Sequence, residues 1–140
     1  MILSTGVEMQ YIVDTHALIW FLEGNSRLGS AAKQVLENSE SKLALPAIAL
    51  AEAAFIVERG KTSIPSVNDL HTAVNGDPRI VVYPLDRAII EITNTLLSIN
   101  EMHDRQIVAT AIILKNHGEE VSVLTCDQNI IASGVVPIIW

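Results

Sequence analysis

The sequence predicts an α/β fold, a three-layer α/β/α sandwich around a central, mostly parallel sheet. Short aliphatic runs of strand length alternate along the chain with longer segments whose apolar residues recur at helical spacing. Parallel neighbours need long crossover connections, which are usually helices and cover both faces of the sheet. The length of 140 residues suits one domain, so we expect a single domain over 1–140. Residues 1–8 read as a short extension, and Met9 is an alternative start.

Each predicted strand is a short, mainly aliphatic run bounded by polar or turn-forming residues. The five runs are 10–13, 42–45, 80–83, 121–125 and 136–139. Asp14 closes the first run, and Asp127 follows the fourth. A turn-forming cluster, Asn-Gly-Asp-Pro at 75–78, precedes the third. These strands would all enter one sheet.

The predicted helices lie between these runs and carry the usual start and stop residues. They cover 15–22, 30–39, 47–59, 67–74, 87–97 and 105–116, with a short helical turn after Asp127. Pro46 suits a first helical turn, and Gly60 and Gly118 lie just beyond two helix ends. Asp86 is placed to cap the helix that begins at Arg87.

The charge and composition narrow the possible functions. Sixteen acidic residues against nine Lys and Arg give a formal net charge of −7, which argues against a broad basic surface for nucleic acid. A nucleic-acid substrate would therefore need metal ions and a few local bases. Hydrophobic residues make up 49%, and the mean hydropathy is +0.36, so we expect a partner to cover some apolar surface.

The sequence shows no sign of export or of membrane insertion. Cys126 is the only cysteine, which excludes an internal disulfide and fits a reducing compartment. The N-terminus lacks the basic and apolar regions of a signal peptide. The longest apolar stretch, 43–57, contains Pro46 and Glu52 and is too short to span a bilayer. We expect a cytoplasmic protein without a membrane role.

Two acidic residues follow predicted strands, at the edge where open α/β sheets bind ligands. These are Asp14 and Asp127. Either is equally suited to cap the helix that follows it. Position alone therefore leaves a structural and a functional reading open for both.

Two further acids lie on helix faces that should be buried. The residues three and four positions from Glu52 are all apolar: Ile48, Ala49, Phe55 and Ile56. Asp104 extends the apolar stripe of Ile107, Val108, Ala111 and Ile112 at the start of its helix. Glu52 has an alternative as a buried acid paired with a base, and Asp104 has one as a helix cap.

Four carboxylates that converge would repel one another, and a divalent cation would relieve that repulsion. Oxygen donors favour a hard cation, so Mg²⁺ or Mn²⁺ is expected. No His or Cys spacing typical of zinc occurs, and no phosphate-binding glycine loop. Thr15 and Thr125 are candidates to orient the carboxylates, with ordinary turn hydroxyls as the alternative. We interpret Cys126 as a buried structural thiol.

Three segments resemble the motifs of one family. Residues 11–20 (YIVDTHALIW) look like an opening strand with a first acid, 101–111 (EMHDRQIVATA) like a third-acid helix, and 124–127 (LTCD) like a Thr-x-Asp turn with a fourth acid. The chain resembles the PIN-domain ribonucleases, and specifically VapC-type toxins of prokaryotic toxin–antitoxin pairs. Residues 47–52 (AIALAE) supply the second acid, with Ala47 and Ala49 where members often carry Ser or Thr.

The resemblance extends over about 10–140 and implies a metal-dependent endoribonuclease. Asp14 and Asp104 would bind Mg²⁺ or Mn²⁺ directly, and Asp127 and Glu52 would complete the site directly or through water. The implied partners are an RNA substrate, a cognate antitoxin protein and a second copy of the chain in a homodimer. The candidate bases for RNA contact are Arg87 and Arg105, together with Arg59 and Lys61.

Two other functions are compatible with parts of the pattern. One is a non-catalytic PIN-like binding module, although all four acids are present. The other is a haloacid-dehalogenase-like phosphotransferase, which also begins with a strand ending in Asp. Members of that class carry a second Asp two positions later, where this chain has His16.

Overall fold

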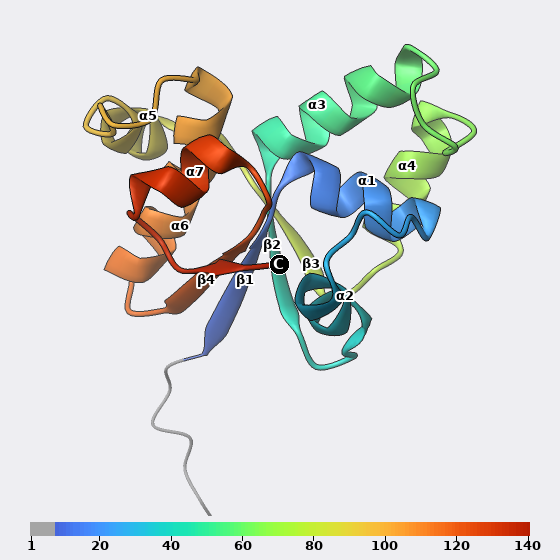
Figure 1. Ribbon diagram of the computed structural model, residues 1–140, viewed down its shortest axis with the longest axis horizontal. Helices are drawn as coiled ribbons and strands as arrows, with labels where there is room; N and C mark the ends of the chain where they lie inside the picture. Colours follow the sequence, from blue (N-terminus) through green and yellow to red (C-terminus); the bar gives the residue numbers. More distant parts are fainter. Residues whose placement is uncertain (1–7) are drawn as a thin grey trace, which may run out of the picture.

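The computed structural model describes residues 8–140, and its strands form a five-stranded sheet in the order β3-β2-β1-β4-β5 (Figure 1). All neighbouring strands run parallel. The strands are β1 (Met9–Val13), β2 (Lys42–Pro46), β3 (Ile80–Tyr83), β4 (Glu120–Leu124) and β5 (Ile138–Ile139). The predicted parallel sheet is confirmed.

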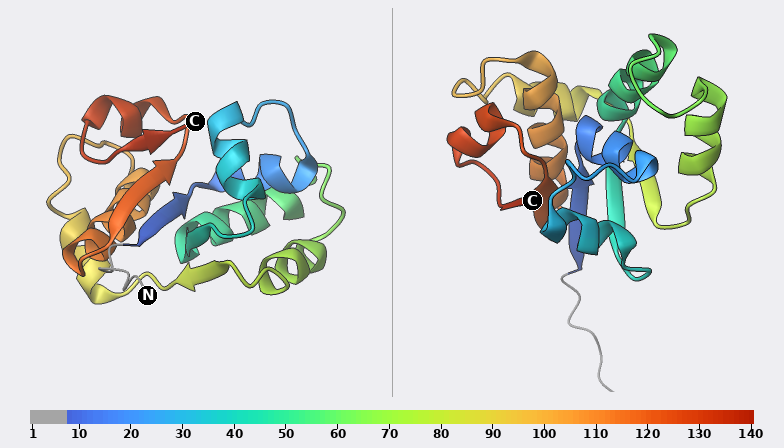
Figure 2. Two further views of the ribbon diagram at one scale, coloured as in Figure 1. Left: turned by 90° about the horizontal axis from the view of Figure 1, so that it is seen from below. Right: turned by 45° about the vertical axis from the view of Figure 1, so that its right-hand side comes forward.

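Helices pack on both sides of this sheet. They are α1 (Thr15–Glu23), α2 (Ser30–Glu37), α3 (Ala47–Glu58), α4 (Val67–Asn75), α5 (Arg87–Thr93), α6 (Met102–Asn116) and α7 (Gln128–Ser133). Helices α1 to α4 lie on one side of the strands and α5 to α7 on the other (Figures 1 and 2). Helix α6 contacts β1, β2 and β4. The three-layer α/β/α arrangement is therefore confirmed.

The path of the chain makes β1 the point at which the strand order reverses. From β1 the chain moves through α1 and α2 to β2, and from β3 it returns through α5 and α6 to β4 on the other side of β1. Ligands of open α/β sheets bind at such a switch point, beyond the carboxyl ends of the strands. Val13 lies beside Leu124 in the register, and the Asp14 amide donates to the Leu124 carbonyl at 3.3 Å. The residues that follow β1 and β4 thus emerge together.

The core is aliphatic and has two parts. The larger cluster joins the strands to α1 through α4 and to one side of α6 and includes Ile12, Leu43 and Leu45. The smaller cluster lies among α5, α6 and α7 and includes Ile99 and Ile130. Strands covered on both faces need continuous apolar runs, which explains why their sequences lack a polar alternation.

The start of α6 differs from the prediction. The helix begins at Met102 and not at residue 105, because the Glu101 side chain accepts a hydrogen bond from the Asp104 amide at 3.0 Å and caps it. Met102 is exposed, so the apolar stripe gave no signal for this first turn. Asp104 therefore lies within the helix.

The end of α5 differs as well. The helix ends at Thr93 and not at residue 97. The hydroxyls of Thr93 and Thr95 donate to the carbonyls of Ile89 and Ile92, and such side-chain bonds compete with regular helix. All other boundaries agree with the prediction to within two residues.

The expected extension at 1–8 falls mainly outside the described residues, which begin at Glu8. The Glu8 carbonyl accepts from the Glu120 amide at 3.2 Å, and its carboxylate lies 2.5 Å from the Lys42 ammonium. The single-domain boundary at 1–140 stays a prediction. Within 8–140, no helix combines the length and apolar character needed to cross a membrane.

Candidate active site

A cavity of about 440 Å³ opens at the carboxyl edge of the sheet, next to the switch point. Residues from β1–α1, α3, the start of α6 and the β4–α7 connection contribute to its wall. Its lining residues are Asp14, Thr15, His16, Trp20, Glu52, Glu101, Asp104, Cys126, Asp127 and Asn129. The fold therefore brings all four acids selected from the sequence to one cavity.

Asp14 both caps a helix and faces the cavity. Its Oδ1 accepts from the Thr15 amide at 2.6 Å, and its Oδ2 accepts from the Thr125 hydroxyl at 2.5 Å. Only 8% of the residue is exposed. Burial raises the pKa of Asp14, while the hydrogen bonds from Thr125 and Thr15 act in the opposite direction. The structural and functional readings of Asp14 are thus compatible.

Asp127 follows the neighbouring strand β4 and, like Asp14, both caps a helix and lines the cavity. It caps α7 by accepting from the amides of Asn129 and Ile130 at 2.9 and 3.1 Å. The Thr125 hydroxyl oxygen accepts from the Asp127 amide at 3.0 Å while it donates to Asp14. Thr125 therefore links two acids that are far apart in the sequence.

Asp104 is buried in the first turn of α6, with 9% of the residue exposed. The alternative that it caps this helix is wrong, because Glu101 does so. Burial is the largest influence on Asp104, followed by the charges of Asp127, Glu101 and Asp14, and together they raise its pKa to about 7. Its carboxylate lies among like charges without a neighbouring Lys or Arg in the cavity wall.

Glu52 reaches the cavity from the middle of α3. Its Oε1 accepts from the Thr15 hydroxyl at 3.4 Å, and its Oε2 lies 3.4 Å from Nδ1 of His103. Burial raises the pKa of Glu52, the charge of a protonated His103 lowers it, and Asp14 and Glu101 raise it further. The alternative of a paired acid is realised in part, although the partner is a histidine on another helix.

Sequence reasoning passed over several residues that contribute to this cavity. Glu101 lies three positions before Asp104, and this spacing is typical of a helix cap and the third residue of its helix. The spacing could have predicted that Glu101 caps α6. His103 pairs with Glu52 and lies 3.7 Å from Glu101, and nothing local in the sequence indicates that. Cys126 is half-buried and lines the cavity, so the expectation that it is buried is wrong, while its structural role stays a prediction. Desolvation and the charge of Asp14 raise the pKa of the Cys126 thiol.

The structure does not bring the candidate RNA-binding bases to this cavity. Arg87 is almost fully exposed and pairs with Glu91 along α5 at 3.3 Å. Arg105 donates through Nε to the Ile99 carbonyl, and Arg59 lies 5.3 Å from the centre of the Phe55 ring. Lys61 is absent from the cavity wall as well. Their positions in the sequence did not indicate how far from the cavity the fold would place them.

The chemistry of the cavity suits a hard cation. Its side chains, however, are not arranged as a complete coordination shell. The carboxylates in its wall offer oxygen donors, which are the ligands that Mg²⁺ and Mn²⁺ prefer. Raised pKa values at Asp14, Glu52 and Asp104 are what uncompensated burial of like charges produces. Within residues 8–140, however, no three acidic, His or Cys side chains are arranged to hold one ion. Side-chain movement would be required to bind it.

Comparison with known proteins agrees with this architecture. Three solved structures are similar in fold: FitAcB from Neisseria gonorrhoeae (21% identity, TM-score 0.64, 91% of this chain and 95% of that chain), VapC20 from Mycobacterium tuberculosis, a sarcin-ricin loop cleaving toxin (15%, 0.67, 93% and 99%), and VapBC2 from Rickettsia felis bound to a promoter DNA fragment (14%, 0.66, 93% and 97%). No curated protein sequence gives a significant match. A profile of the PIN domain matches residues 11–133, most of the chain. The chain therefore belongs to the PIN-domain family.

Proposed function

We propose that this protein is a metal-dependent endoribonuclease that acts as the toxin of a prokaryotic toxin–antitoxin pair. The observation that carries the proposal is the meeting of four carboxylates from separate elements in one cavity at the switch point of a PIN-domain sheet. Three of the four have pKa values raised by burial and like charge, so a bound cation would be strongly favoured there.

In this proposal Asp14 and Asp104 hold Mg²⁺ or Mn²⁺, and Asp127 and Glu52 complete the site. A bound divalent ion would acidify a water molecule and offset charge on the phosphodiester. The protein's own groups prepare the site: Thr125 fixes Asp14, and Thr15 and His103 hold Glu52. Asp104 must lose its proton before it can bind a metal ion.

The proposed partners follow from the family and from the surface. The similar solved structures include a sarcin-ricin loop cleaving toxin and a toxin–antitoxin complex from Klebsiella pneumoniae. Several large apolar side chains are exposed, including Phe55, Val81, Leu97 and Met102. Exposed apolar side chains in this number are consistent with a surface that a partner covers. We therefore propose RNA as substrate, a cognate antitoxin as inhibitor and a homodimer as the isolated state.

The decisive experiment is RNA cleavage by Asp104→Asn. Purified wild-type protein should cut structured RNA only when Mg²⁺ or Mn²⁺ is present, and chelation should stop it. Asp104→Asn should lose at least about 100-fold in cleavage rate, since it removes a charge that would hold the metal ion. Asp86→Asn is the matched control, because Asp86 caps α5 away from the cavity and Asn also caps helices.

Three outcomes would contradict the proposal in different ways. Cleavage by Asp104→Asn at the wild-type rate would remove Asp104 from the active site. Metal-independent binding of RNA without cleavage would favour the binding-module alternative. Hydrolysis of a small phosphomonoester in place of RNA would favour the phosphotransferase.

A further inference from the structure

An acidic protein that acts on RNA must hold the phosphates next to its active site. The net charge is −7, and the acidic cavity itself carries Asp14, Glu52, Glu101, Asp104 and Asp127. A polyanion is repelled by such a wall unless cations lie nearby. The arginines and the lysine proposed from sequence lie elsewhere, so the cations must come from other residues.

A second cavity, of about 720 Å³, adjoins the acidic one. It lies along the end of α1, the following loop and the start of α2, and Trp20 lines both cavities. Its charged lining residues are Arg27, Lys33 and Glu37. The second cavity thus has a net positive wall next to a strongly negative one.

Trp20 and Arg27 form a continuous path between the two cavities. The Arg27 guanidinium lies 5.9 Å from the centre of the Trp20 ring. The His16 ring, which lines the acidic cavity, lies 5.3 Å from the same ring, centre to centre. The half-buried Trp20 also contacts the Trp140 ring at 5.8 Å. An aromatic and cationic surface therefore leads outward from the four acids.

The loop that carries Arg27 is held in place by Asn25. The Asn25 amide donates to the Trp20 carbonyl at 2.8 Å, and its side-chain oxygen accepts from the Arg27 amide at 2.9 Å. Its side-chain nitrogen donates to Glu23 at 3.1 Å. Within residues 8–140 no carboxylate pairs with the Arg27 guanidinium, whereas Lys33 is paired with Glu37 at 3.6 Å. The backbone of Arg27 is thus held in place, and its guanidinium lies over the Trp20 ring.

We propose that the second cavity is an RNA-binding subsite, in which Arg27 pairs with a phosphate flanking the scissile bond and Trp20 stacks against a base. This inference rests on the proposed ribonuclease function and assigns its substrate contacts. Guanidinium groups bind phosphate oxygens in pairs, and aromatic rings stack on bases without regard to sequence. An arginine that lies beside an aromatic ring and has no carboxylate partner within residues 8–140 fits this chemistry better than it fits an apolar protein segment.

The test is charge reversal at Arg27 with a matched reversal at Arg59. Arg59 also lies over an aromatic ring, at 5.3 Å from the Phe55 centre, but it lines neither cavity. Arg27→Glu should raise KM for a single-stranded RNA about tenfold and leave kcat within about twofold. The slope of log affinity against log salt should fall by about one. Arg59→Glu should resemble wild type in all three measurements.

A binding measurement separates this inference from the proposed function. The same RNA is titrated, without cleavage, into Asp104→Asn with and without Arg27→Glu. Weaker binding caused only by the Arg27 change supports the subsite even if the wild type never cleaves RNA. Equal binding by the Arg27 and Arg59 variants overturns the subsite even if cleavage is established.

Substitutions of Trp20 provide an independent test of the subsite, and a conservative variant serves as the control for misfolding. Trp20→Phe keeps a ring and should bind RNA within about threefold of wild type, whereas Trp20→Ala should bind about tenfold more weakly. Circular dichroism identifies an unfolded alanine variant, in which case Trp20→Leu takes its place. If Arg27→Glu weakens binding of a co-expressed antitoxin and leaves RNA binding unchanged, the cavity belongs to the protein partner and the inference fails.

Discussion

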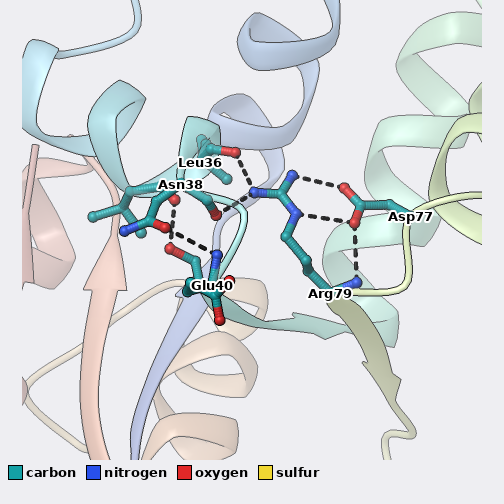
Figure 3. A network of polar contacts seen from close by, with 7 residues as sticks. Leu36, Asn38, Glu40, Asp77 and Arg79 are labelled. Atoms are coloured by element: carbon teal, nitrogen blue, oxygen red, sulfur yellow. Dashed lines mark hydrogen bonds and ion pairs between the residues drawn. The ribbon is translucent and has the colours of Figure 1, made fainter.

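Two sites with buried or half-buried acidic side chains show opposite electrostatics in this protein. At the start of β3, both carboxylate oxygens of Asp77 accept from the Arg79 guanidinium at 3.0 and 2.8 Å (Figure 3). The same guanidinium donates to the carbonyls of Leu36 and Asn38, at the end of α2. The hydrogen bonds from Arg79 lower the pKa of Asp77, and those to Asp77 raise the pKa of Arg79.

The acidic cavity has the same type of side chain without such a partner. Asp104 is buried among Asp14, Asp127 and Glu101, and its pKa rises to about 7. At the first site the chain supplies a cation, Arg79, as partner for the acid, whereas the acidic cavity has no Lys or Arg in its wall. An acid paired within the chain stabilises the fold, whereas acids crowded without a cation favour a ligand that brings one. This difference yields four predictions: three at fixed pH, taken from the largest effect on stability to the smallest, and then the pH dependence.

The largest effect is expected from Arg79→Met. The change removes four charged hydrogen bonds: two connect Arg79, just before β3, to the end of α2, and two bind Asp77, which loses its partner. We expect the free energy of unfolding to fall by about 2 kcal/mol and the Tm by about 7 °C. Thermal unfolding measures this, with Arg87→Met as control, since its exposed pair with Glu91 should contribute little. Equal losses in the two variants would contradict the comparison.

Added metal ions should stabilise the wild-type protein. A ligand that binds only the folded state, at about ten times its Kd, adds about 1.4 kcal/mol and raises the Tm by about 5 °C. Asp14→Asn should abolish this increment, whereas Arg79→Met should keep it on a lower baseline. Differential scanning fluorimetry with Mg²⁺, Mn²⁺ and a chelator checks it. A Tm unchanged by both ions would count against the metal site.

Asp104→Asn should stabilise the metal-free protein, in contrast to its effect on cleavage. The variant removes a buried charge that Asp127, Glu101 and Asp14 repel. We expect a gain of about 1 kcal/mol, or about 4 °C in Tm, without metal. Asp86→Asn, an exposed cap outside the cavity, should change the Tm little. A destabilised Asp104→Asn would mean that the hydrogen bond between this carboxylate and Asn129 outweighs the repulsion.

The last prediction concerns the pH dependence of the metal-free protein. The pKa of Asp104 is about 7 when folded and about 3.9 when unfolded, so the folded state takes up the proton first as pH falls. Stability should rise from pH 8 toward pH 5, and cleavage should decline over the same window because a protonated carboxyl binds metal poorly. Asp77, with its lowered pKa, keeps its stabilising charge throughout this window.

Chemical denaturation at several pH values tests this last prediction. The slope of unfolding free energy against pH should be shallower in Asp104→Asn than in wild type. The remaining slope comes from Asp14 and Glu52, whose pKa values are also raised. Identical slopes in the two proteins would show that Asp104 does not titrate in this range.

Much of the fold was predictable because it depends on short-range patterns. Strand and helix positions follow from apolar periodicity and from residues such as Gly118 and Asp86, which act on their immediate neighbours. The α6 boundary was missed because Met102 is exposed and Glu101 is an uncommon cap. The α5 end was missed because hydroxyls interrupt the helix while its apolar pattern continues.

The amino-acid sequence by itself determined the order of elements, the parallel sheet and the four acids that it could offer to a site. Tertiary structure alone decided which side chains meet: Thr125 with Asp14, His103 with Glu52, and Arg27 with the cavity beside Trp20. The physical reason is range. Periodicity and capping act over a few residues, whereas those contacts depend on the crossover paths that carry distant segments to one edge of the sheet.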